Sequence, residues 1–380
     1  MKKEYATNVT AYPMADYESM LQSTNDDSEK DSKGRFLLDC PRVSVIIVNY
    51  NGAPFLDRLL SSMNDQTFKD FEVIIVDNAS KDDSLKVVEN LFSGSSNFNV
   101  IRLSQNYGYC EGNNIGLEFS KGEYIVLLNN DTYVSSTWLE NLVKVMDENH
   151  SVGACQSNII NYVNKQVVLG NFLGIYGRAK LSNPLVRKGD VFHGLFYASG
   201  ACVILRRKVI EELGYLFDSK QFTGDMDLGW RVRLIGFDVA TSLGSLCYHF
   251  QGYSSRMVLL NQANASYVIF KDVIRTFIKN YSGRRFFRRS PLFFGFLSLV
   301  ALYESMKFRA PCVFSLMKAI VWNTAFLKDS WTEHLKVQAS RKISDDEIEN
   351  AMLPYPAELY FLRLKLIHTQ RSKYESEFRG

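Results

Sequence analysis

The stretch YIVLLNNDT, residues 124–132, reads as an apolar strand that ends in amide and carboxylate side chains. Two earlier stretches have the same form, since residues 43–48 run into Asn49-Tyr50-Asn51 and residues 72–76 run into Asp77-Asn78. In an open α/β sheet, ligands bind beside the carboxyl ends of the parallel strands. The three polar strand ends therefore predict a nucleotide site at one edge of a sheet, with a metal ion as a candidate component.

The residues around these stretches alternate between β-branched strands and helical segments. We expect strands at residues 43–48, 72–76, 99–103 and 123–128, and helices at residues 54–63, 82–92 and 110–119. Strands that alternate with helices indicate an α/β fold with a mostly parallel, doubly wound, Rossmann-like sheet. Further along, we expect a strand at 196–205, a helix at 225–234, short strands at 237–241 and 245–250, and helices from about residue 257.

Composition narrows the class of protein. The 380-residue chain has 46% hydrophobic and 22% charged residues, which is ordinary for a folded soluble protein. Its net charge of +3 is too small to indicate nucleic-acid binding by itself. The six cysteines include no CxxC pair, so we expect no disulfide framework or zinc site, and a reducing compartment. The polar N-terminus lacks a signal-peptide pattern, which predicts a cytoplasmic location.

The chain divides into three predicted parts. Residues 1–40 are polar and are expected to form a mobile tail, because they cannot bury enough surface to offset the entropy of ordering. Residues 41–256 contain the alternating pattern and are expected to form the catalytic domain. Residues 257–380 are expected to form a helical C-terminal region.

A basic and aromatic segment, RRFFRRSPLFFGFLSLVALY, occupies residues 284–303. Its apolar run is shorter than the roughly 20 residues that a membrane-spanning helix needs. We therefore expect residues 284–330 to contact the cytoplasmic face of a membrane, with phenylalanines in the interface and arginines on anionic headgroups. The alternative is a helical appendage whose apolar face packs on the α/β domain.

Asp77 follows the second predicted strand. Its carboxylate is suited to accept a hydrogen bond from the imide N–H of a uracil or thymine ring. The alternative is a helix cap, but Ser80 or Asp82 is equally able to cap the next helix, which would leave Asp77 for a ligand.

A glycine-rich loop follows the third predicted strand. Asn106 and Gly108 precede the run GNNIG, residues 112–116, which includes Asn113 and opens a helix. Backbone N–H groups in such a loop are placed to bind phosphate or ribose. The loop matches neither GxGxxG nor the Walker lysine pattern, which argues against dehydrogenases and P-loop enzymes. The alternative is a plain connecting loop.

Two further features offer metal ligands. Asn129, Asn130 and Asp131 supply oxygen donors of the kind that Mg²⁺ and Mn²⁺ prefer. A single carboxylate makes a weak site, so a bound diphosphate would have to complete it, and the alternative is an Asx-rich turn. His249 ends the last predicted strand and is a second candidate ligand, although a lone histidine is more often structural.

The run GDMDLGWR, residues 224–231, begins a helix with two carboxylates two positions apart. Successive helix positions project about 100° apart, so Asp225 and Asp227 cannot both face the same point. One of them is placed to act as a base in its charged form while the other caps the helix. The bare pattern, without its neighbours, favours capping.

Taken in order, these motifs resemble the family 2 glycosyltransferases, which have the GT-A fold. The resemblance extends from about residue 43 to residue 255, and it rests on VIIVNYN (45–51), VDNAS (76–80), NYGY (106–109), GNNIG (112–116), LLNNDT (127–132), SGAC (199–202) and GDMDL (224–228). It implies an inverting transferase that moves a sugar from a UDP- or dTDP-sugar to a hydroxyl of a glycan or lipid-linked saccharide. Nucleic acid is not an expected partner.

The resemblance also implies roles for individual residues. Asp225 falls at the general base, and Asp131 and His249 fall at the ligands of a Mg²⁺ or Mn²⁺ ion. The implied donor-binding residues are Asn49, Asn51, Asp77, Asn106, Gly108, Asn113, Asn129 and Asn130. The implied acceptor-side residues are Gly200, Asp227 and Trp230.

Two positions depart from the family pattern. Asn129 replaces the first aspartate of the DxD metal motif, a variation shared by the rhamnosyltransferase- and galactofuranosyltransferase-like branch. Gly224 replaces the glutamate that usually precedes the base. These changes leave open a catalytically silent GT-A domain that acts as a binding or scaffold module. The absence of a QxxRW sequence argues against a processive synthase, and the absence of a basic residue after the first strand argues against a nucleotidyltransferase.

Overall fold

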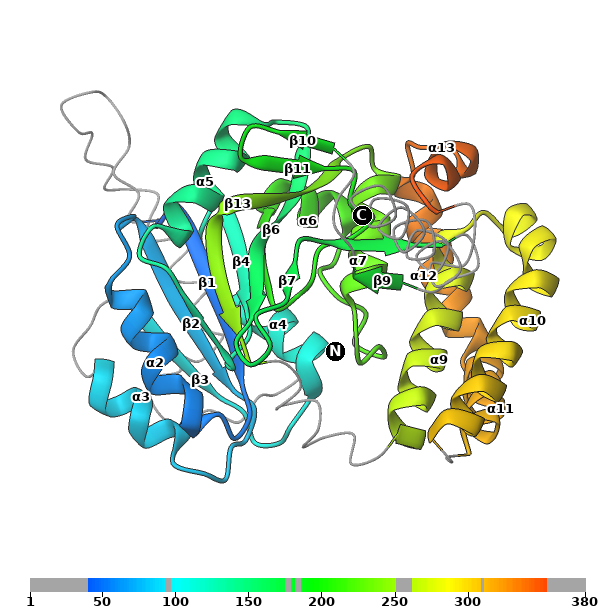
Figure 1. The fold of residues 1–380 in the computed structure, drawn as a ribbon, viewed down its shortest axis with the longest axis horizontal. Helices are drawn as coiled ribbons and strands as arrows, with labels where there is room; N and C mark the ends of the chain where they lie inside the picture. The colour runs from blue at the N-terminus through cyan, green and yellow to red at the C-terminus, as the bar shows by residue number, and fades with distance from the viewer. Residues whose placement is uncertain are drawn as a thin grey trace, which may run out of the picture.

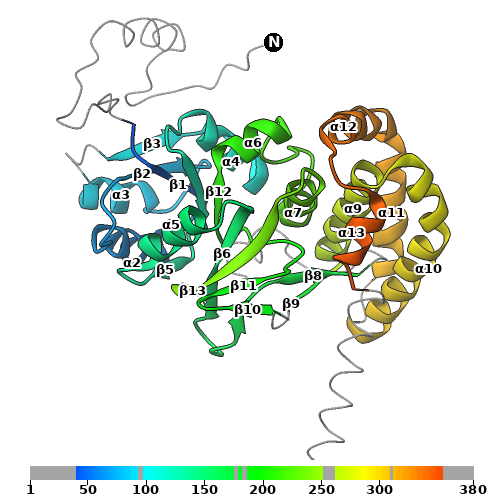
Figure 2. The same ribbon diagram turned by 90° about the horizontal axis from the view of Figure 1, so that it is seen from above.

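The computed structural model describes residues 40–92, 97–174, 179–181, 186–250, 262–308 and 311–353. The predicted N-terminal tail, apart from residue 40, lies outside the described residues. An α/β part comes first in the chain, and a group of C-terminal helices packs against one side of it, as Figure 1 and Figure 2 show. The predicted α/β class with a helical C-terminal region is therefore confirmed.

One large sheet organises the α/β part. Its order is β10-β11-β13-β6-β12-β4-β1-β2-β3, with β5 paired to β13 and β7 paired to β6. Its strands are β1 (Val43–Asn49), β2 (Phe71–Asp77), β3 (Phe98–Arg102), β4 (Tyr124–Leu128), β5 (Thr132–Val134), β6 (Val152–Asn161), β7 (Val167–Val168), β10 (Val186–Lys188), β11 (Val191–His193), β12 (Cys202–Arg206) and β13 (Asp238–His249). A separate pair consists of β8 (Asn171–Leu173) and β9 (Ala179–Leu181).

The helices fall into two groups. Those of the α/β part are α2 (Ala53–Asn64), α3 (Ser84–Phe92), α4 (Gly108–Glu118), α5 (Trp138–Glu148), α6 (Arg207–Leu213) and α7 (Asp225–Leu234). Those of the C-terminal group are α9 (Gln262–Asn280), α10 (Gly283–Phe308), α11 (Cys312–Ala325), α12 (Leu327–Ser340) and α13 (Asp345–Asn350).

The strand directions place the polar strand ends together. β1 lies between β2 and β4 and is parallel to both, with Asn49 in register with Asp77. β12 enters antiparallel between β4 and β6, and Cys202 at its start is paired with Leu128 at the end of β4. The residues just before β12 therefore lie at the same edge of the sheet as the carboxyl ends of β1, β2 and β4.

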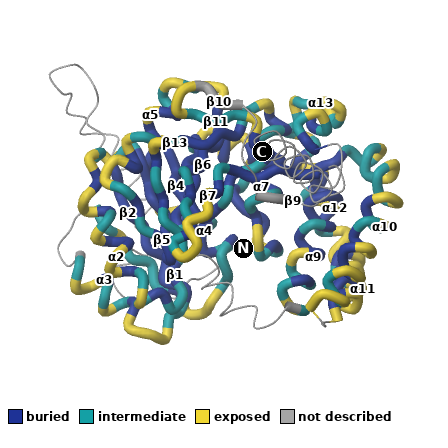
Figure 3. The backbone as a smooth tube through the Cα atoms, viewed as in Figure 1, coloured by how far each residue is buried: buried dark blue, intermediate teal, exposed yellow. Residues whose placement is uncertain are grey.

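Apolar side chains on the two faces of the sheet form separate cores. On one face, β1, β2 and β4 pack against α2, α3 and α5 through residues such as Leu59, Val88 and Leu142. On the other face, the sheet packs against α4, α6 and α7 through residues such as Ile115 and Val232. Figure 3 shows the strands of the sheet as mostly buried, which agrees with their almost continuous β-branched sequences.

Two predicted strands differ from the observed ones. The strand expected at 196–205 is regular only from Cys202, because the chain turns at Ser199, whose carbonyl accepts from Cys202 N at 3.3 Å. The two short strands expected at 237–241 and 245–250 are one strand, β13, with a register shift between Ser242 and Leu246. The shift arises where Leu243 N donates to Asp190 O at 2.8 Å, instead of to β6.

The C-terminal helices share a core with α7. Trp230 of α7 is fully buried and makes edge-to-face contacts with Phe277 and Tyr281 of α9, at ring-centroid distances of 5.3 and 4.9 Å. Phe277 in turn stacks on Phe293 of α10 at 4.2 Å. This packing attaches the C-terminal helices to the helix that carries Asp225 at its N-terminus.

Candidate active site

A chain of hydrogen bonds joins the carboxyl ends of β1, β2 and β4. Asn130 Nδ2 donates to Asn49 Oδ1 at 2.9 Å, and Asn49 Nδ2 donates to Asp77 Oδ1 at 3.0 Å. All three side chains are at most 5% exposed. A Cβ on Gly52 would lie 2.2 Å from Asn49 Oδ1 and 2.4 Å from Asn130 Nδ2, so this crossing has room only for glycine. The predicted donor-side residues Asn49, Asp77 and Asn130 thus form one fixed layer.

The turn after β2 ties this layer to the loop after β1. Ser80 Oγ accepts from Asn49 Nδ2 and from Asn51 N, each at 3.0 Å, and Ser80 N donates to Asp77 Oδ2 at 3.1 Å. At the start of α3, the side chain that accepts a backbone N–H bond is Asp82, through Oδ1 at 3.1 Å. Asp77 is therefore not a cap of α3, and its carboxylate is oriented by Asn49 and Ser80.

The glycine-rich loop before α4 is held by asparagine amides. Asn78 Nδ2 donates to Gly108 O at 3.1 Å, and Gly108 N donates to Asn106 Oδ1 at 2.8 Å. Gly108 has φ +84°, a left-handed conformation that favours glycine, and it is the first residue of α4. Asn113 Nδ2 donates to the carbonyl oxygen one turn earlier in α4 at 2.9 Å. Asn106, Gly108 and Asn113 therefore shape the helix start beside the end of β2.

Asp131 and His249 are brought into contact although they are far apart in sequence. Strand β5 pairs with the end of β13, so that His249 is in register with Thr132, and His249 Nε2 lies 3.1 Å from Asp131 Oδ1. The side chain of Asp131 is 2% exposed and that of His249 is 13% exposed. Within the described residues, no group of three or more His, Cys, Asp or Glu side chains converges. An imidazole nitrogen and a carboxylate oxygen that face each other fit two positions of a divalent cation, and other donors must complete its coordination.

Asp225 is the first residue of α7, and its carboxyl group reaches the segment just before β12. Gly200 N donates to Asp225 Oδ2 at 2.9 Å, and Tyr109 Oη donates to Gly200 O at 2.9 Å. A Cβ on Gly200 would lie 2.4 Å from Asp225 Oδ1 and 2.3 Å from Tyr109 Oη. Burial raises the pKa of Asp225 to about 6, against the opposing effect of the Gly200 N–H bond.

A backbone hydrogen bond connects the segment beside Asp225 with the residues that follow β4. Asn129 N donates to Ala201 O at 3.0 Å, and Ala201 directly follows the glycine that contacts Asp225. The Asn129-Asn130-Asp131 run and the carboxylate of α7 therefore border one edge of the sheet. A pKa near 6 leaves the Asp225 carboxylate mostly ionised at neutral pH, which a general base requires.

Two of the predicted acceptor-side residues face the protein interior. Asp227 is 0% exposed, with Oδ2 2.8 Å from Arg231 Nε, and Lys279 Nζ lies 3.1 Å from the same carboxylate. Trp230 is 0% exposed and packs on α9. Neither side chain reaches solvent, so an acceptor-side contact does not fit their positions, and Gly200 is the member of the predicted set that lies beside Asp225.

The structure brings in residues that the sequence patterns did not single out. Tyr109 contacts the backbone against which Asp225 packs, Ser80 orients the strand-end layer, and Asn78 binds Gly108 in the loop before α4. Each of them lies within a motif that had been quoted for its neighbours, NYGY or VDNAS. The sequence signal for Tyr109 was therefore its place in the NYGY motif. Only the tertiary structure shows that Tyr109 contacts Gly200.

Known protein families and curated proteins include sequences similar to this chain. Residues 44–214 match the family model described as Glycosyl transferase family 2. A Haemophilus influenzae protein described as an uncharacterized glycosyltransferase is 27% identical over 187 residues, which cover 47% of this chain and 56% of that protein. A Campylobacter jejuni GalNAc(5)-diNAcBac-PP-undecaprenol beta-1,3-glucosyltransferase is 34% identical over 119 residues, 30% of this chain and 38% of that protein. This chain thus spans about half, or less, of the length of these relatives.

Solved structures share the fold. S. aureus TarS 1-349 in complex with UDP-GlcNAc gives a TM-score of 0.51 at 17% identity, over 82% of this chain and 89% of that chain. GalNAc-T7 with UDP, GalNAc and Mn²⁺ gives 0.51 at 16% identity, over 73% and 61%. Residues 44–214 are thus similar to glycosyl transferase family 2, and the chain shares the GT-A fold with these solved structures.

Proposed function

We propose that this chain is an inverting glycosyltransferase that moves a sugar from a UDP- or dTDP-sugar to a hydroxyl group of a glycan or lipid-linked saccharide. The observation that carries the proposal is the position of Asp225. Its carboxylate lies against Gly200, at the edge of the sheet where Asn49, Asp77 and Asn130 are already locked together. A base on one side of a pre-formed polar layer is the arrangement that sugar transfer by direct displacement needs.

In this mechanism the donor nucleotide lies over Asn49, Asp77 and the loop at Asn106. Asp225 accepts the proton of the acceptor hydroxyl as that oxygen attacks the anomeric carbon. The new carbon–oxygen bond forms while the bond from the anomeric carbon to the phosphate oxygen breaks, and a nucleoside diphosphate leaves. The Gly200 N–H keeps one carboxylate oxygen in place, so that the other is available for the proton.

Asp131 and His249 are the residues that would hold Mg²⁺ or Mn²⁺. A divalent cation at that position would neutralise the negative charge of the leaving diphosphate. Two proteins with the same fold have been solved with UDP-GlcNAc and with UDP, GalNAc and Mn²⁺, which supports a UDP-linked donor and a metal here. Asn129 in place of the first DxD aspartate is the feature that favours the rhamnosyltransferase- and galactofuranosyltransferase-like branch.

A transfer assay with Asp225→Asn tests the base. The variant keeps the shape and the Gly200 hydrogen bond but cannot accept the hydroxyl proton, so we expect transfer to fall by at least about 100-fold, the lower range for loss of general-base catalysis. Donor binding, measured by calorimetry with UDP and Mn²⁺, should stay unchanged. Asp346→Asn, an exposed carboxylate on α13, is the matched control. Near-normal turnover of Asp225→Asn would remove Asp225 from the base role.

A catalytically silent scaffold is the competing interpretation. It predicts no release of nucleoside diphosphate from any UDP- or dTDP-sugar, whereas an active transferase slowly hydrolyses its donor even without an acceptor. Screening nucleotide sugars by thermal shift with Mn²⁺, followed by a diphosphate-release assay on those that bind, separates the two functions and identifies the donor.

We further propose that residues 41–256 are the catalytic domain and that the C-terminal helices dock on the cytoplasmic face of a membrane. Among the described residues, sixteen of the twenty exposed large hydrophobic side chains lie between Phe287 and Leu335. Residues 283–340 also contain nine Lys or Arg and only three Asp or Glu. This combination of apolar and basic surface fits an anionic bilayer. Contrary to the expectation from the apolar run alone, α10 is long and apolar enough to span a membrane by length and composition. It is the one such helix within the described residues, and 22% of its most apolar window is buried.

Vesicle flotation tests this docking. We expect the wild-type protein to float with phosphatidylglycerol vesicles and to remain at the bottom with phosphatidylcholine vesicles. The double variant with Leu299→Glu and Phe314→Glu should remain at the bottom even with phosphatidylglycerol vesicles. These two side chains are 67% and 68% exposed, so the substitutions should not unfold the protein. A concentration-dependent dimer that the same substitutions abolish, without flotation, would show instead that a second copy covers this face.

A further inference from the structure

Helix α9 holds the segment that leads to Asp225. Asp272 Oδ2 accepts three hydrogen bonds from residues 222–223, namely Phe222 N at 2.9 Å, Thr223 N at 2.8 Å and Thr223 Oγ1 at 3.1 Å. Thr276, one turn further along α9, accepts from Gln221 Nε2 at 2.7 Å. Three consecutive residues before the start of α7 are therefore bound to one face of α9.

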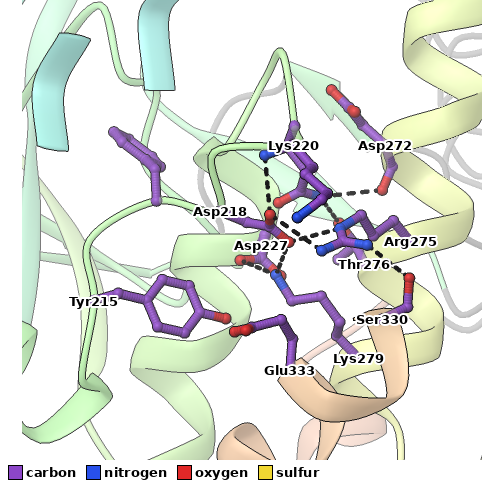
Figure 4. A network of polar contacts seen from close by, with 12 residues as sticks. Tyr215, Asp218, Lys220, Asp227, Asp272, Arg275, Thr276, Lys279, Ser330 and Glu333 are labelled. Atoms are coloured by element: carbon purple, nitrogen blue, oxygen red, sulfur yellow. Dashed lines mark hydrogen bonds and ion pairs between the residues drawn. The ribbon is translucent and has the colours of Figure 1, made fainter. Parts of the chain in front are cut away.

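The same helix also binds the chain on both sides of these contacts. Before them, Asp218 Oδ2 lies 2.7 Å from Arg275 Nε and 2.9 Å from Lys279 Nζ. After Asp225, Asp227 lies within reach of the same Lys279 Nζ at 3.1 Å. Figure 4 shows Arg275 and Lys279 reaching from α9 toward Asp218, with Lys279 also beside Asp227. Burial alone would raise the pKa of Asp227, but Lys279 and Arg231 outweigh it, so the pKa is lowered and the pair stays charged.

The three hydrogen bonds that the Asp272 carboxylate accepts fix both the position and the direction of the backbone at residues 222–223. The residue after Thr223 is Gly224, where a Cβ would lie 2.2 Å from a ring carbon of Phe217, so this position has no side chain to hold the turn. On the side of α4, Cys110 Sγ lies 3.7 Å from Phe222 O, and Asn114 binds the backbone of Phe217, just before this segment, at 2.9 and 3.0 Å. The direct anchor of residues 222–223 is therefore Asp272.

From these contacts we propose that Asp272 is a positioning residue for the reaction, which holds the Asp225 carboxylate against Gly200 although it touches neither substrate nor Asp225. The inference rests on the proposed role of Asp225 as base. It gives the C-terminal helical region a part in catalysis that is separate from membrane docking. Loss of the Asp272 anchor would let the start of α7 move outward. The Asp225 carboxylate would then leave its position against Gly200, and water would reach it.

The pH profile distinguishes positioning from mere folding. Among the described residues, Tyr109, Tyr197 and Cys110 feel the charge of Asp225, and burial raises the pKa of each, so all three stay neutral at and below neutral pH. A difference in the acid limb of kcat between wild type and an Asp272 variant therefore reports Asp225, whose pKa of about 6 is held up by burial. If water reaches this carboxyl group, its pKa falls toward the ordinary aspartate value and the acid limb moves to lower pH.

The experiment compares Asp272→Ala and Asp272→Asn with Glu349→Gln. Glu349 pairs with Arg285 and Arg289 in the C-terminal helices and does not contact the 218–223 segment, so its variant controls for loss of a partly buried carboxylate. For Asp272→Ala we expect kcat to fall by about 100-fold, the effect of a displacement of about 1 Å. The KM for the donor should be unchanged, and the acid limb should shift down by at least about half a pH unit. Asp272→Asn, which keeps an acceptor oxygen, should show smaller changes of both kinds.

Hydrogen exchange provides a readout that needs no activity. The amides of Phe222 and Thr223 should exchange at least about tenfold faster in Asp272→Ala than in wild type, because they lose their acceptor, while the amides of β4 stay protected. Unchanged exchange, or a folded Asp272→Ala variant with wild-type kcat and acid limb, would overturn the inference. A wild-type protein without transfer activity would refute the proposed function, and the exchange result would still decide whether Asp272 anchors the segment.

Discussion

The clearest physical test of the site is the dependence of stability on pH in Asp225→Asn. The folded-state pKa of Asp225 is about 6, whereas the ordinary aspartate value is 3.8. Because the folded state binds the proton more tightly than the unfolded state, the stability of the wild type falls as pH rises through this window. Between pH 5 and pH 8 the loss is about 1.4 kcal/mol, and over the whole shift it is about 3 kcal/mol. Asparagine has no charge to desolvate, so the variant escapes this loss.

The assay is urea unfolding of wild type and Asp225→Asn at pH 5, 6.5 and 8, with the free energy of unfolding extrapolated to water. We expect the variant to gain about 1.4 kcal/mol relative to wild type between the lowest and highest pH. The other carboxylates titrate equally in both proteins, so their contributions cancel in the difference. A difference that does not change with pH would show that the carboxyl group is not desolvated. A difference of opposite sign would show that a cation-like partner stabilises its charged form.

Three other substitutions probe separate parts of the site. Gly200→Ala should lower kcat in the transfer assay by about 100-fold and leave donor binding intact, because the added Cβ would displace the Asp225 carboxylate. The control is Gly295→Ala, where an added Cβ meets nothing within 4 Å. Lys279→Met should cost about 3–5 kcal/mol in urea unfolding because it removes the buried cation that Asp218 and Asp227 share. Lys336→Met at an exposed pair should cost under about 1 kcal/mol. His249→Gln should weaken Mn²⁺-dependent UDP binding in calorimetry by at least about tenfold, or 1.4 kcal/mol, and unchanged metal dependence would exclude His249 as a ligand.

Strand identity was readable from sequence because buried parallel strands are nearly continuous β-branched runs. The predicted strand at 43–48 is confirmed as β1, and the predicted helix at 225–234 is confirmed as α7. The strand at 196–205 was wrong in its first half, because the apolar side chains of Phe196 and Ala198 are buried without belonging to the sheet. Burial and strand formation give the same local signal, and only the pairing with β4 and β6 separates them.

The sequence by itself determined the fold class and the polar strand ends, because β-branched runs and the asparagine and aspartate residues that follow them are local features. Tertiary structure decided which of these groups meet. The contact between Asp131 and His249 depends on the pairing of β5 with β13. The different environments of Asp225 and Asp227 depend on α9, because its Lys279 pairs with Asp227. Two carboxylates of one helix turn receive opposite environments, one desolvated at the sheet edge and one ion-paired in the interior, because helix geometry points them toward different neighbours.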